Sequence, residues 1–391
     1  MKRRKRWFAG MLAGCVAFTL FPASISQAAA ERTQQESAVK TKVTQLATNY
    51  RTNPIGIETE KIRFAWQMDS TVIGAKQSAY QIKVFAEDGS AVWDSGKVDS
   101  DRSAGIVCGG EIAERSIYRW ELTVWDQAEK SYTEEASFET GVSNLQEWKS
   151  AEFICMNKSR LAPVFRAEKA LEQKEIRRAR LYITALGAYQ AYINGSQVGE
   201  WDEEGKLIYH HMNPGYGNAN MSLGYQTYDV TSFLAGAESA AVAINAGTGW
   251  YNGMGNTDVS SPAVKALLLV DYADGSSQVL KTNTADWKGT LAGGITASGV
   301  YYGEDYNAIF ARELGDYTKA GYDDSAWVNA RGSGEGSGQP ASPCIVNQFP
   351  QQTSTYVRLL VHESGPAIEV PGRICCRLWN WSFWTQKRII W

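Results

Sequence analysis

The sequence is poor in the residues from which most nucleophile and transition-metal sites are built. Only three of its 391 residues are histidine, and none lies near a recognisable serine or cysteine nucleophile motif. The six cysteines form no Cys-x-x-Cys pair and no Cys/His spacing that suits zinc. Any disulfide pairing is left open. The sequence therefore favours neither a zinc site nor thiol chemistry.

Charge of one sign is also lacking. The 39 basic and 42 acidic residues nearly cancel, at a formal net charge of -3. Beyond the first six residues no basic cluster stands out, so no nucleic-acid partner is expected.

Long apolar runs are missing after the N-terminus, and no membrane span is expected. Residues 1–30 are typical of an export signal, with a basic start at Lys2–Arg6, an apolar stretch over Trp7–Pro22 and small residues around Ala28 for cleavage. A membrane anchor is the alternative, but the apolar run is shorter than the ~20 residues that span a bilayer. Cys15 could instead be lipid-modified. Either way we expect an exported, extracellular or cell-surface protein.

A polar segment follows over residues 31–48. Val39, Val43 and Leu46 lie at helical spacing, so a short helix or a loose spacer is predicted here.

Strict alternation of apolar and polar residues begins beyond Asn49. Tyr80–Val84 and Tyr118–Val124 alternate as half-buried strands do. Asp88–Gly89 predicts a hairpin turn between two such strands. Residues 49–141 are therefore predicted to form a fibronectin- or immunoglobulin-like β-sandwich.

A second β region is predicted over residues 142–345. Ala179–Ile183 and Ala188–Ile193 are strand-like, and Asn194–Gly195 is a turn signal. Leu267–Tyr272 predicts a buried strand, and Arg331–Pro343 is a flexible linker or loop. Many strands joined by glycine-rich turns are typical of a jelly-roll-like β-sandwich, which makes the whole chain all-β.

Ten short runs, taken in order and spacing, carry a family resemblance: Asn53–Ile57, Arg63–Gln67, Gln77–Ile82, Trp93–Val98, Ala179–Gly187, Ile193–Gly195, Tyr225–Thr231, Gly249–Gly253, Tyr302–Tyr306 and Tyr322–Trp327. Together they resemble the N-terminal, non-catalytic half of bacterial α-L-rhamnosidases, glycoside hydrolase family 78. The resemblance covers about residues 49–361, and residues 346–370 would begin the next β domain.

The resemblance implies hydrolysis of terminal α-L-rhamnosyl residues by the full-length family, through an (α/α)6 barrel with an acid and a base. No part of this chain resembles that barrel, so no catalytic residue is assigned and the chain is expected to be inactive alone. Glu203–Glu204 and Asp323–Asp324 are adjacent carboxylates, which in a strand point apart. We interpret both as solvated pairs rather than an acid/base pair.

The last residues, 371–391, crowd cysteine with tryptophan and have no strand or helix period. Read one base later, with suitable codons, they can spell the valine- and glycine-rich strand of the family. We therefore expect a frameshifted tail on a truncated rhamnosidase; a genuine aromatic C-terminus is the alternative.

Aromatic residues are abundant, at 12% of the chain. Most are expected in β cores, but two glycine-flanked clusters are candidates for stacking on sugar and bonding to its hydroxyls. Carboxylates between aromatics would also suit Ca²⁺, and some modules that resemble the second domain bind rhamnose with its help. The candidate carbohydrate-binding residues are Trp250, Tyr251, Asn252, Tyr302, Glu304 and Asp305.

Three functions stay open on the sequence. The chain is an accessory part of a rhamnosidase, a free-standing module that binds rhamnose-containing glycans, or a structural pair of sandwiches without a ligand.

Overall fold

The structure is a computed structural model. It describes residues 41–156, 161–201, 204, 206–208, 213–215, 223–251, 261–300, 303–333, 368–370 and 373–375. The predicted export signal and Cys15 lie outside these residues. So does the predicted tail, residues 371–391, except for the backbone of the short strand β26 (Arg373–Cys375), which pairs with β25 (Ile368–Val370) just before the tail. Among the described helices, none has the length and apolar character that a membrane crossing needs.

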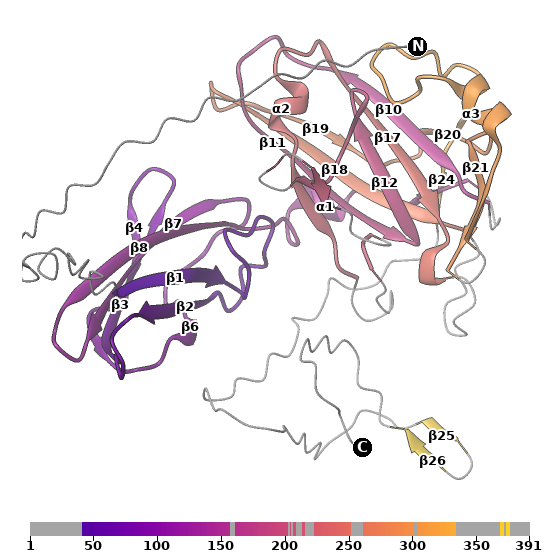
Figure 1. Cartoon of the computed structure of the whole chain (residues 1–391). Coiled ribbons are helices and arrows are strands. Elements are labelled where there is room, and N and C mark those ends of the chain that lie inside the picture. The colour runs from indigo at the N-terminus through magenta and orange to yellow at the C-terminus, as the bar shows by residue number, and fades with distance from the viewer. Residues whose placement is uncertain are drawn as a thin grey trace, which may run out of the picture.

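The first domain is an antiparallel sandwich of two sheets, drawn in indigo and purple in Figure 1. One sheet has the order β1-β2-β6, and the other β4-β3-β7-β8 with β5 beside β3. Its strands are β1 (Thr41–Thr48), β2 (Arg63–Ser70), β3 (Gln77–Ala86), β4 (Ala91–Asp94), β5 (Val98–Asp99), β6 (Ala104–Val107), β7 (Ile117–Asp126) and β8 (Ser131–Glu139). The predicted sandwich is confirmed.

The core of this domain follows from the alternation in its strands. The inward positions of β3 and β7 bring Ile82, Val84, Trp120 and Leu122 into one buried cluster. The predicted hairpin turn is present as well, since Gly89 has a φ of 82° and donates its backbone N–H to the Ala86 carbonyl at 2.9 Å.

Residues 41–48 correct the sequence prediction, because they form the edge strand β1 instead of a helix or spacer. Val43 and Leu46 are both buried although they lie three residues apart. The pairing register with β2 shifts between Thr44 and Ala47, and Gln45 has a φ of 50°. This β-bulge turns the second apolar side chain back to the core, which imitates helical spacing in the sequence.

The second domain is a jelly-roll-like sandwich of two larger antiparallel sheets, magenta to orange in Figure 1. The cleft sheet has the order β13-β12-β17-β10-β20-β23, and the interface sheet has the order β16-β11-β18-β9-β24 with β19 beside β18. The cleft sheet consists of β10 (Val164–Ala170), β12 (Ala188–Ile193), β13 (Ser196–Gln197), β17 (Ser239–Gly247), β20 (Lys288–Thr290) and β23 (Val328–Asn329). The interface sheet consists of β9 (Ile154–Cys155), β11 (Ile176–Leu186), β16 (Gln226–Asp229), β18 (Ala263–Tyr272), β19 (Ser277–Lys281) and β24 (Arg331–Gly332).

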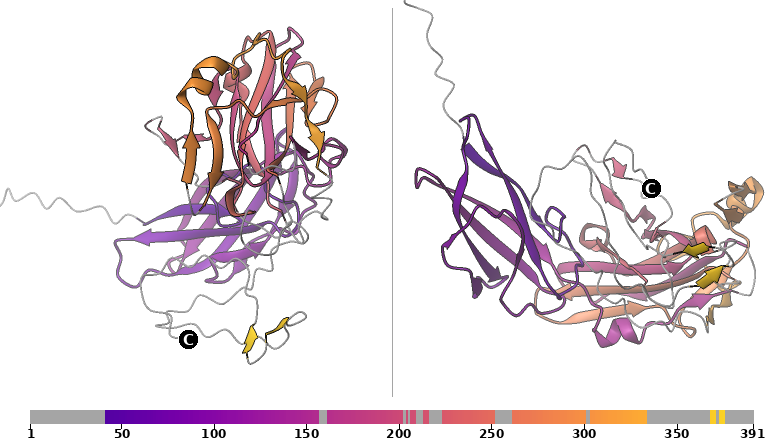
Figure 2. Two further views of the ribbon diagram at one scale, coloured as in Figure 1. Left: turned by 90° about the vertical axis from the view of Figure 1, so that its right-hand side faces the viewer. Right: turned by 90° about the horizontal axis from the view of Figure 1, so that it is seen from below.

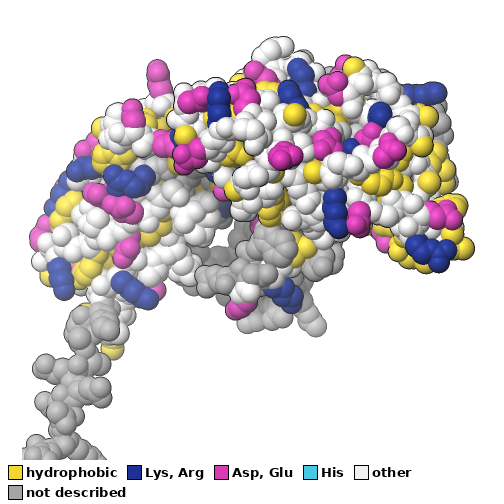
Figure 3. Space-filling model, turned by 90° about the horizontal axis from the view of Figure 1, so that it is seen from above, with side chains coloured by type: hydrophobic (Ala, Val, Ile, Leu, Met, Phe, Trp, Pro, Cys, Tyr) yellow, Lys and Arg dark blue, Asp and Glu magenta, His cyan; other side chains and the backbone are white. Residues whose placement is uncertain are grey.

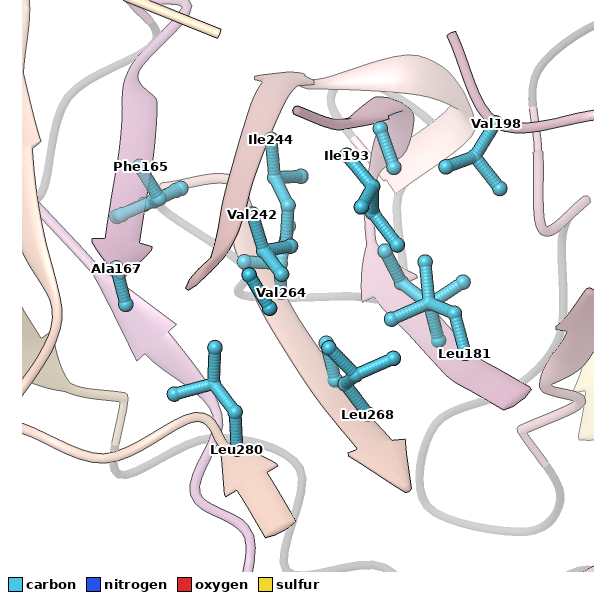
Figure 4. Packing of buried hydrophobic residues seen from close by; sticks show 14 of the residues in the cluster. Phe165, Ala167, Leu181, Ile193, Val198, Val242, Ile244, Val264, Leu268 and Leu280 are labelled. Carbon is cyan, nitrogen blue, oxygen red and sulfur yellow. The ribbon is translucent and has the colours of Figure 1, made fainter. Parts of the chain in front are cut away.

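Apolar side chains from the facing sides of these two sheets form the main core. Figure 4 shows Phe165, Val242 and Ile244 from the cleft sheet packed toward Leu181 and Leu268 from the interface sheet. Because side chains alternate along a strand, the residues between them point to the opposite, outer face of each sheet.

Short elements complete the domain. Asn194 and Gly195 have φ angles of 48° and 86°, which confirms the predicted turn after β12. The remaining elements are α1 (Gln146–Lys149), β14 (Glu200–Trp201), β15 (Leu207–Ile208), α2 (Thr231–Leu234), the 3-10 turn η1 (Gly249–Tyr251), β21 (Ile295–Gly299), β22 (Gly303–Tyr306) and α3 (Ala308–Leu314).

The first domain packs against one end of the interface sheet (Figure 2). Arg180 in β11 donates to both carboxylate oxygens of Glu139, at the end of β8, and Arg178 donates to Asp271 beside Arg115. The Tyr225 hydroxyl accepts the Val142 backbone N–H at 3.0 Å. Buried polar contacts therefore join the two sandwiches.

Candidate functional site

A cleft of about 500 Å³ lies on the outer face of the cleft sheet. The end of β17 and its neighbours β10 and β12 form the floor. Residues of the β21–β22 hairpin form one wall, and Tyr317 also lines the cleft. The volume is within the range of roughly 300–1,000 Å³ that is common for small-molecule sites.

One row of residues crosses the floor. The strand register places Asn245 of β17 directly between Gln190 of β12 and Val164 of β10. Directly opposed side chains in such a ladder have Cβ atoms about 5 Å apart. The floor therefore changes from two amides at one end to an aliphatic side chain at the other.

Hydrogen bonds from two tyrosines orient the amides. The Tyr317 hydroxyl donates to Asn245 Oδ1 at 2.8 Å, and the Tyr192 hydroxyl donates to Gln190 Oε1 at 2.7 Å. With both amide oxygens engaged, each side chain keeps an NH₂ group whose donors have no partner among the described residues. The amide end of the floor therefore presents two hydrogen-bond donor groups.

The hairpin wall is held against β17 by close packing. Thr248 Oγ1 donates to the Ser298 carbonyl at 2.5 Å, and a Cβ at Gly247 would come within 2.3 Å of Ser298 Oγ. Gly249 has a φ of 52° and packs against the backbone at Gly187. These glycines allow close approach between segments of the chain itself.

The segment that contains Tyr317 is held in place by Arg166, whose side chain is only 2% exposed. Its guanidinium donates to the Tyr317 and Lys319 carbonyls at 3.0 Å each and to Asp324 at 2.6 Å. Lys288 also donates to Asp324, at 2.7 Å. Burial alone would raise the pKa of Asp324, but these two cationic donors hold it below its usual value.

The pair Asp323–Asp324 is therefore not solvated as a pair, which corrects the sequence interpretation. Asp324 is committed to Arg166 and Lys288, whereas Asp323 accepts the Ser325 backbone N–H at 3.0 Å. Asp324 is bound by the two cationic side chains, Asp323 bonds within its own turn, and the two carboxylates do not form an acid/base pair. Of the other adjacent pair, Glu203 lies outside the described residues.

The six residues predicted to bind carbohydrate do not all line the cleft. Glu304 lines the cleft from β22, but its neighbour Asp305 does not, because side chains alternate along the strand. Tyr251 is only 2% exposed and packs with Leu186 and Ala263, so its ring offers no face to a sugar. The side chains of the other three lie outside the described residues: Trp250, Asn252 and Tyr302.

The described residues do not fit a calcium site. Ca²⁺ takes six to eight oxygen ligands, and within the described part of the chain no three Asp, Glu, His or Cys side chains converge. Glu304 and Asp305 are neighbours in β22, so their side chains face apart.

Sequence reasoning missed Gln190, Asn245 and Tyr317. They lie 55 and 72 residues apart along the chain, in strands or loops of ordinary composition. Strand pairing places Gln190 beside Asn245, and a hydrogen bond from a distant loop places Tyr317 on Asn245, so no local sequence signal could have found them.

Comparison with known proteins supports the division of the chain into these two domains. Residues 43–144 match the model of the Rha78A-like N-terminal immunoglobulin domain, and residues 174–353 match the α-L-rhamnosidase N-terminal domain. An α-L-rhamnosidase of Formosa agariphila is 30% identical over 357 residues, covering 81% of this chain and 35% of that protein. One of Alteromonas is 30% identical over 298 residues, covering 70% and 31%.

Solved structures show the same fold. The α-L-rhamnosidase from Dictyoglumus thermophilum aligns at a TM-score of 0.67 and 28% identity, over 77% of this chain and 35% of that one. The Streptomyces avermitilis α-L-rhamnosidase, solved with L-rhamnose, aligns at a TM-score of 0.68 and 22% identity, over 77% and 46%. The chain thus spans about a third of the length of the curated relatives it matches first. It belongs to the α-L-rhamnosidase family, of which it carries the N-terminal immunoglobulin domain and the N-terminal β-sandwich domain.

Proposed function

We propose that this chain is the accessory, carbohydrate-facing part of an α-L-rhamnosidase, and that it binds a rhamnosyl unit in the cleft without hydrolysing it. The observation that carries the proposal is the meeting of Asn245, Gln190 and Glu304 around one cleft. Two amide donors and a carboxylate acceptor are the groups that hydroxyl-rich ligands require.

The lack of hydrolysis follows from the number of carboxylates. An inverting glycosidase needs an acid and a base about 6.5–9.5 Å apart on opposite sides of the glycosidic bond. Glu304 is the one carboxylate among the described residues that line the cleft. A single carboxylate can hold a hydroxyl but cannot supply both roles.

The affinity should be modest. The cleft is open, and sugar hydroxyls that stay hydrated gain little from binding. A dissociation constant in the millimolar range, about 4 kcal/mol, is therefore expected.

The test is a titration of L-rhamnose into the mature protein, followed by NMR. Glu304→Gln should weaken binding, because an amide with one acceptor oxygen replaces a carboxylate with two. Asp305→Asn is the matched control, since this neighbouring carboxylate points away from the cleft. Equal loss of L-rhamnose binding in the two variants, or no loss in either, would contradict the assignment of the cleft as the binding site. Trp250→Ala tests the predicted stacking residue in the same way.

The proposal includes export, with loss of about the first 28 residues. A basic start, an apolar stretch and small residues follow one another in the order of a signal peptide. Intact-mass measurement of secreted protein is the test. Cytoplasmic protein that retains Met1 would contradict export, whereas a lipid on Cys15 would move only the cleavage site.

A further inference from the structure

The cleft floor is polar at one end and aliphatic at the other. At one end lie the two amides, Gln190 and Asn245. At the other end Val164 is 4% exposed and is joined in the lining by Ala162 and Ile295. The step from donors to aliphatic carbon occurs within one cross-strand row.

The donor end suits two neighbouring hydroxyl oxygens. Both NH₂ groups are oriented by tyrosine hydroxyls bonded to the amide oxygens, so neither amide can turn its acceptor into the cleft without losing a bond. Adjacent positions in the ladder bring the two donors to the spacing at which one sugar ring can meet both.

The aliphatic end suits a methyl group and disfavours a hydroxyl. Among the described residues, Val164, Ala162 and Ile295 offer no side-chain hydrogen-bonding group, so a hydroxyl placed there would lose its water without a replacement. A 6-deoxyhexose carries vicinal hydroxyls and a methyl group on the same ring, and it matches both ends at once.

We infer that Gln190 and Asn245 are the specificity-determining donors for the sugar, and that Val164 selects a 6-deoxy sugar over its 6-hydroxy counterpart. This inference rests on the proposed function, since it names how the same cleft chooses its ligand. Tyr317 is a positioning residue, because it acts through Asn245.

The experiment compares L-rhamnose with L-mannose, which differs from it only by a hydroxyl at C6. NMR titration of the mature protein should give an affinity for L-mannose at least about fivefold weaker, from burial of an unpartnered hydroxyl. Val164→Thr, nearly the same size with a hydroxyl added, should bring the two affinities closer together.

Gln190→Ala and Asn245→Ala should each weaken L-rhamnose binding about three- to tenfold, the value of one lost hydrogen bond. Asn245→Asp keeps the size and the acceptor for Tyr317 but removes the donor, so it should behave like Asn245→Ala if the donor matters. Gln146→Ala on α1, an exposed glutamine outside the cleft, is the control and should bind as the parent does. Circular dichroism verifies that each variant is folded.

Two results overturn the inference and leave the proposed function standing: equal affinity for both sugars, or parent-like L-rhamnose binding by both folded alanine variants. No binding of L-rhamnose by the parent protein overturns both.

Discussion

Arg180 and Glu139 form a two-pronged ion pair between the two sandwiches, with nitrogen–oxygen distances of 2.8 to 3.1 Å. Both residues are buried. Glu139 ends the last strand of the first domain, and Arg180 lies within β11 of the second. A buried charge without its partner is costly, so loss of either member of the pair should destabilise the protein.

Replacing Glu139 with glutamine should therefore lower the free energy of unfolding by about 3 kcal/mol, the lower end for breaking a buried pair, because Asp229 still pairs with Arg180 at 2.8 Å. Glu135→Gln is the control. It breaks the exposed pair with Arg119 and should cost no more than about 0.5 kcal/mol. Urea unfolding measures both; similar values for the two variants would contradict the role of the interface pair.

Lys265 should make the stability of the protein depend on pH. Its Nζ lies 4.7 Å from the ring centre of Trp148 and 5.7 Å from that of Phe153, and burial lowers its pKa to about 8. The folded state therefore disfavours the cation. This penalty is fully present below pH 8 and disappears as the pH rises toward the unfolded value of about 10.4.

Lys265→Met should accordingly stabilise the protein at pH 7, with a gain that shrinks between pH 8 and 10. Thermal unfolding across this range measures the effect, with Lys42→Met, on an exposed position of β1, as the control. A gain that is constant with pH would mean that the methionine packs better and that charge burial is not the cause.

Gly247 should be intolerant of a larger side chain. A Cβ there would meet Ser298 at 2.3 Å, so Gly247→Val forces the β21–β22 hairpin away from β17. Binding of L-rhamnose should fall at least about fivefold, since Glu304 moves with the hairpin. Gly224→Val is the control, because Gly224 also lacks a positive φ, is exposed and has nothing within 4 Å of an added Cβ; it should leave binding unchanged.

Removing calcium should not change the affinity for L-rhamnose. The described residues of the cleft offer one carboxylate and two amide donors, which is not a calcium ligand set. Titration with and without a chelator is the measurement. Loss of binding on chelation would place the sugar with a calcium ion bound by other residues, and would contradict the cleft as its site.

The sequence predicted the sandwich pair well, because alternation in strands such as Tyr118–Val124 reports burial directly. It misassigned β1, where a bulge at Gln45 breaks the alternation. It also placed Tyr251 in the site, although burial of an aromatic ring depends on the fold and not on its neighbours in sequence. Gln190 and Asn245 could not be predicted, since only strand pairing unites them.

The proposed function requires that this chain bind rhamnosyl groups and leave them uncleaved. The most direct measurement is an NMR time course of an aryl α-L-rhamnoside at millimolar concentration with the mature protein. Signals of the rhamnosyl ring should broaden or shift in proportion to the protein, with no free rhamnose or aryl alcohol formed. Release of aryl alcohol in proportion to added protein, absent from a mock purification, would contradict the account, and so would unchanged rhamnosyl signals.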